Sequence, residues 1–349
     1  MPPEGEIGSE FHWDPAALLG AERGGLPGWL PDRRELFATG CGALTALLRR
    51  VRPAGRVHIP SFFCTGVAHV LSQRVRIAWY RHLPDGRGPH WETLRPAEGD
   101  MVLAQNLFGR EPGEPWRAWM RAHPRIPVIE DHSHDPFGEW SRTSAAAYAV
   151  ASLRKTLPLP DGGLLWSPRG MPLPAPTGPE SHGAHLKLAA MLLKTAWLEG
   201  RTVDRDGFRQ LQVQGEQELL GSEGPASAFT RAALPALDVT GLRATGERRA
   251  RELSQALDLP SGGPFRVQLF CRDRAGRDGL LSHLARNGIF APVHWRQDRT
   301  GFWSGDPMAA DAADRILTLP VDHRCSLADV RRIAEVTRAF MPVVNAGVA

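Results

Sequence analysis

The chain has 349 residues, 42% of them hydrophobic, which is enough to bury the core of one or two domains of ordinary size. Its formal net charge at pH 7 is +4, but basic and acidic residues alternate, as in 243–252, which predicts solvated helix faces with i,i+4 ion pairs. Neither a nucleic-acid-binding module nor a stretch of roughly 18 apolar residues is present, so we expect a soluble, cytoplasmic protein without nucleic-acid or membrane partners.

Strand-like and helix-like segments alternate through the first half of the chain. The expected strands are 57–59, 76–79, 100–105, 126–131, 147–152 and 163–166. The expected helices between them are 42–52, 64–73 and 114–123. This alternation predicts an α/β fold with a doubly wound, mostly parallel sheet. Ligands of such sheets bind beyond the carboxyl ends of the strands.

The second half begins with a loop rich in proline, glycine and serine at 167–182, followed by a helix at 185–199. We expect a large domain over 1–237 and a smaller C-terminal α+β domain over 238–349. The expected elements of the smaller domain are helices near 238–258, 279–287 and 326–341, and extended segments at 265–271, 290–295 and 316–320.

Lysine is rare in this chain: three of the 42 basic residues are lysines and 39 are arginines. Lys155 lies alone in the loop 152–163, where arginine would supply charge equally well, so it suggests the chemistry of a primary amine, such as a Schiff base. The adjacent Arg154 favours the neutral, reactive amine. The alternative is an ordinary surface lysine. Lys187 and Lys194, seven residues apart on one predicted helix, are expected on its solvated face.

An apolar strand ends in two acids and two histidines within the segment 128–136. A carboxylate such as Asp131 can there hold a heterocyclic nitrogen in its protonated form. The competing interpretation is a metal site made by His132, His134 and Asp135, although no distant third cluster of ligands stands out. The four cysteines lack CxxC pairing, which indicates neither a zinc knuckle nor a disulfide framework and favours a reducing compartment.

A glycine-containing turn at Gly40, Cys41 and Gly42 leads into an amphipathic helix. Exposed amides at a helix N-terminus bind anions, so a phosphate could lie on this turn. The glycines also resemble part of a dinucleotide fingerprint, but the third glycine is absent and the preceding segment 33–37 is a poor strand.

In this order, the segments resemble the fold type I pyridoxal-phosphate enzymes, and specifically the DegT/DnrJ/EryC1/StrS aminotransferase family. The resemblance covers most of the chain and rests on the stretches 39–44, 58–65, 106–109, 128–134, 155 with 161–163, 288–295 and 316–321. The chain departs from the family at Asn106, where members carry histidine, at His132, where a small residue is common, and at Thr156, where many have asparagine.

The resemblance implies an aspartate-aminotransferase-like fold and pyridoxal 5'-phosphate as the cofactor. Lys155 would form the Schiff base and carry the proton, Asp131 would pair with the pyridine nitrogen, and His134 would lie beside the ring. The other implied cofactor contacts are Gly40, Cys41 and Ser152 at the phosphate, Phe63 or Cys64 at the ring face, and Asn106. No resident metal is expected.

The implied reaction moves an amino group from an amino-acid donor to a keto sugar or small keto metabolite, in sugar or secondary-metabolite biosynthesis. The resemblance also implies a homodimer with a shared active site. Two alternatives stay open: another reaction on the same cofactor (lyase, decarboxylase, dehydratase or oxidase), and a non-catalytic regulatory protein that keeps the fold.

Overall fold

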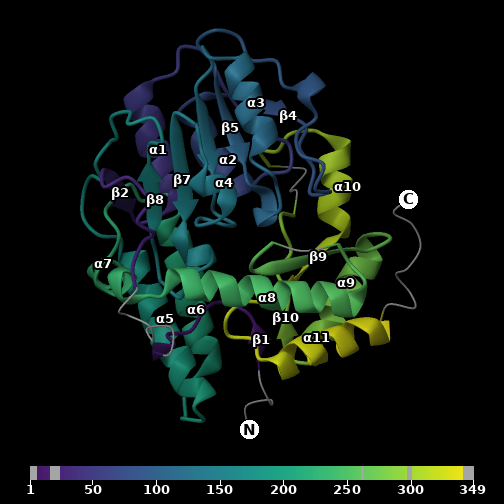
Figure 1. Cartoon of the computed structure of the whole chain (residues 1–349). Helices are drawn as coiled ribbons and strands as arrows, with labels where there is room; N and C mark the ends of the chain where they lie inside the picture. Colours follow the sequence, from purple (N-terminus) through teal and green to yellow (C-terminus); the bar gives the residue numbers. More distant parts are fainter. Residues whose placement is uncertain (1–5, 16–23, 261–262, 297–300, 341–349) are drawn as a thin grey trace.

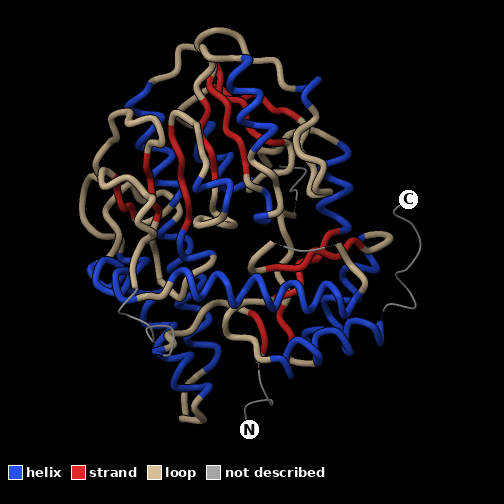
Figure 2. The backbone as a smooth tube through the Cα atoms, viewed as in Figure 1, coloured by secondary structure: helices blue, strands red, loops and turns tan. Residues whose placement is uncertain are grey.

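A central sheet organises the computed structural model, which describes residues 6–15, 24–260, 263–296 and 301–340 (Figures 1 and 2). Within these residues the sheet has seven strands in the order β2-β8-β7-β6-β5-β3-β4. Its strands are β2 (Arg34–Phe37), β3 (Arg56–Pro60), β4 (Arg76–Tyr80), β5 (Met101–Gln105), β6 (Val128–Asp131), β7 (Tyr148–Ser152) and β8 (Gly163–Trp166). β8 is antiparallel to both neighbours and the other pairs are parallel. The predicted α/β class and mostly parallel sheet are confirmed.

Helices pack around this sheet, and further helices form a second layer below it in the view of Figure 1. The helices up to residue 233 are α1 (Gly40–Val51), α2 (Thr65–Ser72), α3 (Glu114–Ala122), α4 (Glu139–Arg142), α5 (His182–Leu198), α6 (Arg205–Leu219) and α7 (Ala228–Ala233). The later elements are α8 (Val239–Leu257), β9 (Arg266–Phe270), α9 (Arg274–Arg286), β10 (Ile289–Phe290), α10 (Pro307–Arg315), β11 (Ile316–Pro320) and α11 (Leu327–Phe340). A short N-terminal strand, β1 (Ile7–Gly8), pairs with β10.

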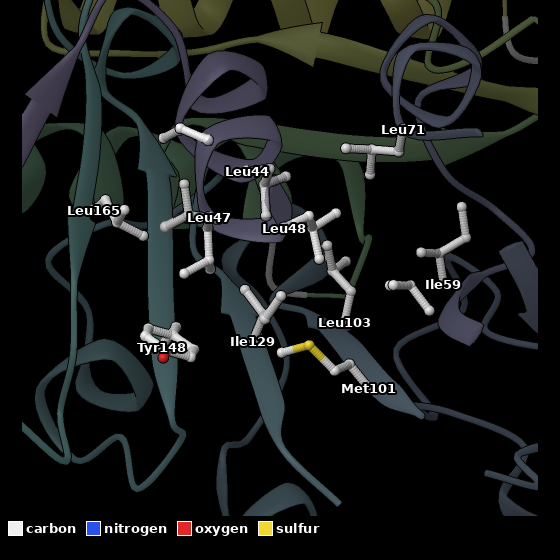
Figure 3. Packing of buried hydrophobic residues seen from close by; sticks show 14 of the residues in the cluster. Leu44, Leu47, Leu48, Ile59, Leu71, Met101, Leu103, Ile129, Tyr148 and Leu165 are labelled. Carbon is white, nitrogen blue, oxygen red and sulfur yellow. The ribbon is translucent and has the colours of Figure 1, made fainter. Parts of the chain in front are cut away.

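The largest apolar cluster lies between the sheet and α1 (Figure 3). Leu44, Leu47 and Leu48 recur at helical spacing on α1 and pack against strand residues such as Ile59 and Leu103, all at most 2% exposed. Burial of each such side chain contributes about 1.5–3 kcal/mol. This packing fixes the N-terminus of α1 at the carboxyl edge of the sheet.

A second apolar cluster is formed by α8, α9, α11 and strands β9 to β11. Ile7 of β1 belongs to this cluster although it is more than 200 residues away in sequence from the others. α8 runs across the molecule beneath the central sheet (Figure 1). Its first turns, with Leu242, pack in a cluster with β7 and β8, whereas Leu253 and Leu257 pack in the second cluster. α8 therefore connects the two packed regions.

The structure corrects the expectation for the two lysines of α5. Lys187 is 4% exposed and Lys194 is 2% exposed, so neither lies on a solvated face. Gly215 of α6 packs directly against Lys187 and brings the two helices together over it. The N-terminal segment crosses α5 and covers Lys194, whose Nζ donates to the carbonyl of Glu10 at 2.7 Å. Segments remote in sequence cause both burials, so the local pattern did not reveal them.

Other local expectations also change in the structure. The segment judged a poor strand forms β2, because it pairs along its length with β8. Of the extended segment expected at 290–295, only its first residue belongs to a strand, β10. α6, α7 and α10 were not predicted.

In the helix face at 243–252, the expected pair between Arg243 and Glu247 is present, but Arg243 also binds Asp135 and is only partly solvated. No helix among the described residues is long and apolar enough to cross a membrane.

Candidate functional site

The carboxyl ends of neighbouring strands bring together residues that are distant in the sequence. Asp131 ends β6, and Ser152 ends β7 just before the short 3-10 turn Leu153–Lys155. The two ends are tied by the Ser152 amide, which donates to the Ser133 hydroxyl at 2.9 Å. Asn106, at the end of β5, donates its amide to the carbonyl of Asp131 at 2.9 Å. The sheet thus places these predicted residues at one edge.

Lys155 lies in a pocket of about 420 Å³ and is exposed to it. Among the described residues its Nζ has no hydrogen-bond or ion-pair partner. The positive charge of Arg154 and, second, partial enclosure by protein lower the pKa of Lys155 to about 8. A neutral amine is the nucleophilic form of lysine, so this environment favours attack on a carbonyl.

A chain of ion pairs holds Arg154 beside this lysine. The Nη2 atom of Arg154 lies 2.5 Å from the Oε1 atom of Glu216, and the other oxygen of Glu216 accepts from Lys187 at 2.9 Å. Lys187 also lies 3.5 Å from the carboxylate of Glu10. The buried Lys187 therefore orients the carboxylate that fixes Arg154. This support was not foreseen from the sequence.

Asp131 is a buried carboxylate, 9% exposed. Its Oδ1 accepts from the amide of Ser133 at 2.9 Å, and no lysine or arginine of the described residues forms an ion pair with it. Burial raises the pKa of Asp131 above its ordinary value. A carboxylate in this position has capacity for a cationic partner, which would stabilise its charged form.

His134 is held as a neutral ring in an aromatic stack. Its Nδ1 accepts from the amide of Phe108 at 2.8 Å, which leaves the proton on Nε2. The ring stacks on Phe108 at 5.2 Å and on Trp295 at 5.6 Å. Burial first, and then the charge of Arg266, hold the pKa of His134 well below its usual range. The ring therefore offers a flat face and a neutral N–H rather than a positive charge.

The turn that opens α1 presents backbone amides at the N-terminus of the helix. Thr39 caps the helix, with its hydroxyl accepting from the Gly42 amide at 2.9 Å, and the first turn carries no acid. The amides of Gly40 and Cys41 have no acceptor among the described residues. A Cβ on Gly40 would lie 3.3 Å from that of Ser152, and one on Gly163 would overlap the Thr39 carbonyl. Gly40 thus lets this turn approach the end of β7, and Gly163 lets it approach the start of β8.

The predicted ring-face residues differ in their surroundings. Phe63 is 2% exposed and belongs to the core beneath the sheet edge, whereas Cys64, at the start of α2, is only partly buried. Burial raises the pKa of Cys41 to about 12, which keeps its thiol protonated. Asn106 is buried, and its Oδ1 has no partner among the described residues.

The residues of the alternative metal site have other partners. His132 is fully buried and lies 3.0 Å from Glu130, and the carboxylate of Asp135 binds Arg243 with both oxygens. Within the described ranges, no group of three or more histidines, cysteines, aspartates or glutamates is placed to hold a metal ion. The side chains of His132 and Asp135 are therefore engaged in separate ion pairs rather than in one cluster of ligands.

The pocket also includes residues that were not predicted. Glu10 comes from the N-terminal segment, Arg209 from α6 and Arg266 from β9. Their sequence context carries no recognisable signal, because arginine is the common basic residue of this chain. Only the packing of three remote segments against the Lys155 turn brings them together.

Comparison with known proteins identifies the fold. No protein-family model and no curated protein sequence matches the chain. The structure is similar to the PLP form of a putative sugar aminotransferase from Streptococcus pneumoniae, with a TM-score of 0.66, 14% identity and coverage of 97% of this chain and 99% of that one. It is equally similar to 3-amino-5-hydroxybenzoic acid synthase, with a TM-score of 0.66, 16% identity and coverage of 98% and 100%.

A third similar structure is a DegT DnrJ EryC1 StrS aminotransferase from Brucella abortus, with a TM-score of 0.61, 17% identity and coverage of 93% of this chain and 94% of that one. At these identities the similarity concerns the arrangement of the backbone over nearly the whole chain. The fold expected from the sequence is therefore confirmed: the chain has the fold of the pyridoxal-phosphate aminotransferases that it resembles.

Proposed function

We propose that this chain is a pyridoxal-phosphate-dependent aminotransferase that takes an amino group from an amino-acid donor and passes it to a keto sugar or small keto metabolite. The proposal rests on two groups at the carboxyl ends of the neighbouring strands β6 and β7: the unpartnered amine of Lys155, with a pKa lowered to about 8, and the unpaired buried carboxylate of Asp131. The fold, shared with aminotransferases over nearly its whole length, supports the proposal.

The residues present fit the cofactor. The amides of Gly40 and Cys41, with Ser152 against them, suit its phosphate, and the vacant acceptor capacity of Asp131 suits a protonated ring nitrogen. When bound, the cofactor supplies an electron sink for charge that develops at the substrate carbon. Lys155 would hold the cofactor covalently and, once released, move a proton at its Nζ. Asp131 would keep the ring nitrogen charged.

The wider biological setting is part of the same proposal. All four cysteines are free, which suits the reducing cytoplasm. Exposed apolar side chains on α5 and α6, such as Leu192 and Val213, suit contact with a second copy in a homodimer. The two apolar clusters suit a division into domains at 1–237 and 238–349, apart from Ile7, which packs in the second cluster, and the first turns of α8, which pack with β7 and β8. The biological role that we propose is the biosynthesis of sugars or secondary metabolites.

The three lysines make a direct test possible. The purified protein is mixed with pyridoxal phosphate, reduced with borohydride and digested, and the modified peptide is identified by mass spectrometry. We expect the adduct on Lys155 and none on Lys187 or Lys194, which are buried in ion pairs. The Lys155→Ala variant should lose the adduct and the visible absorbance. An adduct elsewhere, or none, would contradict the assignment of Lys155.

A second measurement tests the reaction type. The loaded protein is mixed with a panel of amino acids, and conversion of the bound cofactor to pyridoxamine phosphate is followed by absorbance. Conversion with at least one donor supports amino-group transfer. A cofactor bound at Lys155 that no donor converts would favour a different reaction on the same cofactor.

A further inference from the structure

One acid of the N-terminal segment lies among the cations of the pocket that contains Lys155. Five lysine and arginine side chains line this pocket, together with two acids, Glu10 and Asp322. Asp322 is bound to Arg324, with 2.8 Å between Oδ2 and Nη2. Glu10 differs from it, because its side chain is 54% exposed and belongs to a segment remote in sequence from the rest of the lining. Part of the charge balance of the pocket therefore depends on a side chain that a separate segment supplies.

The backbone of Glu10 is held from several sides. The Nζ atom of Lys194 donates to the carbonyl of Glu10 at 2.7 Å, and Nη1 of Arg324 donates to the same carbonyl at 3.2 Å. The guanidinium of Arg324 also lies over the ring of Phe11, 4.4 Å from its centroid. Just before Glu10, β1 pairs with β10. These contacts fix the point from which the side chain extends, and none of them involves its carboxylate.

The carboxylate of Glu10 has only one long contact. Its Oε2 lies 3.5 Å from the Nζ atom of Lys187, whose closer partner is Glu216 at 2.9 Å. A hydrogen bond of this length is weak. No other ion pair within the described ranges holds this carboxylate. A side chain with a fixed backbone and a weakly held carboxylate can turn away while the segment stays in place.

The charge of Glu10 nevertheless acts on the pocket. Enclosure raises its pKa, but the charges of Lys187, Lys155 and Arg154 outweigh that effect and hold the pKa of Glu10 below its ordinary value. Burial lowers the pKa of Arg266 to about 10, and the negative charges of the two lining acids oppose this shift. Glu10 therefore supplies negative charge where an anionic ligand of the pocket would also supply it.

We propose that Glu10 is a specificity-determining residue: its carboxylate occupies the place of a ligand oxyanion and turns away when an anionic ligand enters, so that it lowers the affinity of the pocket for anions. The inference rests on the proposed function only for the identity of the ligand, which would be the substrate that meets Lys155. Two negative charges compete for the same cations, and this competition weakens the binding of anionic ligands but not of neutral ones. The N-terminal segment thus sets which charge a substrate can carry.

The test compares Glu10→Gln with the control Glu199→Gln. Glutamine keeps the size of Glu10 and its backbone contacts but removes the charge. Glu199 follows α5, is similarly exposed at 53%, and pairs with Arg201 outside the pocket. Titration calorimetry measures the binding of maleate, an unreactive dicarboxylate, and of maleamide, its uncharged analogue. Each protein is titrated loaded with pyridoxal phosphate and free of it.

We expect Glu10→Gln to bind maleate about tenfold more tightly than wild type in both states. A unit charge about 10 Å away, partly screened by salt, changes an ionic interaction by roughly this factor. The gain should shrink at high salt, since screening weakens the repulsion that the substitution removes. The affinity for maleamide should not change, and Glu199→Gln should behave as wild type.

A purely structural role of Glu10 predicts the opposite sign. If Glu10 only fixed Lys187, Glu10→Gln would bind maleate as wild type does or more weakly, and that result would overturn the inference. A gain confined to the cofactor-free protein would assign the competing oxyanion to the phosphate of the cofactor, and would overturn the assignment to the substrate.

The reactivity of Lys155 gives a check that needs no ligand. Arg154 is the largest cause of the lowered pKa of Lys155, and the charge of Glu10 opposes it. The pH midpoint for acylation of Lys155 by acetic anhydride, followed by mass spectrometry, should therefore move to lower pH in Glu10→Gln. An unchanged midpoint would contradict a charge of Glu10 that reaches the pocket. Absence of any pyridoxal-phosphate adduct on Lys155 in wild type would refute the proposed function, whereas maleate binding to the cofactor-free protein would still decide the role of Glu10.

Discussion

Replacement of Arg154 by glutamine should raise the pKa of Lys155 and slow its reaction with a carbonyl. Arg154 is the largest cause of the lowered pKa, ahead of partial enclosure. Glutamine removes that positive charge. It also leaves Glu216, now paired only with Lys187, to attract the Lys155 ammonium more strongly. Both changes favour the protonated amine.

The magnitude follows from the protonation equilibrium of Lys155. With its pKa at about 8, roughly a tenth of Lys155 is neutral at pH 7, whereas about one molecule in 3,000 would be neutral at the ordinary value of 10.5. An increase of the pKa from about 8 to about 9 lowers the neutral fraction at pH 7 about tenfold. The rate of adduct formation at pH 7 should fall by about the same factor, and the difference should disappear well above the pKa of the variant.

The assay is the rate of adduct formation with pyridoxal phosphate between pH 6 and 10, trapped by borohydride at timed intervals. We expect the midpoint of the rate profile to move to higher pH in Arg154→Gln. Arg209→Gln serves as the control, since Arg209 lines the same pocket but its guanidinium lies over Phe290. A midpoint equal to or below that of wild type would refute the role given to Arg154.

Three further substitutions probe the site and its support. Asp131→Asn should slow amino-group transfer yet stabilise the cofactor-free protein by about 1 kcal/mol in urea unfolding. Wild type loses stability as the pH rises from 3.8 through the raised pKa of Asp131, so the stability advantage of the variant should grow over this range. A variant less stable than wild type at pH 7 would contradict this expectation. Gly163→Ala should lower the free energy of unfolding by about 1–3 kcal/mol and weaken cofactor binding, because the added Cβ overlaps the turn that opens α1. Gly221→Ala, with open space around it, should change neither property. Lys194→Met should lower the free energy of unfolding by about 2 kcal/mol, because it leaves buried acceptors unpaired. Leu193→Met, at an exposed site on the same helix, is the control. Equal stability of the two variants would contradict the structural role of Lys194.

The sequence predicted the parts of the site that belong to single segments. Asp131 ends β6, Lys155 follows β7, and the turn at Gly40 opens α1. The local pattern of apolar residues indicates such strand and helix boundaries. The structure brings these three segments to one edge because parallel neighbours present their carboxyl ends together. The bounds of α1 and α8 differ from expectation by one or two residues, since periodicity marks a helix better than its ends.

Residues whose role depends on contacts between remote segments escaped sequence reasoning. Lys187 and Lys194 carry the pattern of an exposed helix face, but α6 and the N-terminal segment cover them. Arg266 is one arginine among 39, and only the folded chain places its guanidinium 3.3 Å from the carbonyl of Lys155. The local sequence pattern does not show which charged side chains lack an ion-pair partner in the folded chain.

By itself, the sequence determined the α/β class, the mostly parallel sheet and the order of the segments that end at its edge, because hydrophobic periodicity and turn residues act over short distances. The tertiary structure alone decided which charges surround Lys155, which of them are neutralised, and which segments cover α5. Those properties depend on burial and on distances between atoms far apart in the chain, and they set the reactivity of the one lysine that faces the pocket among the described residues.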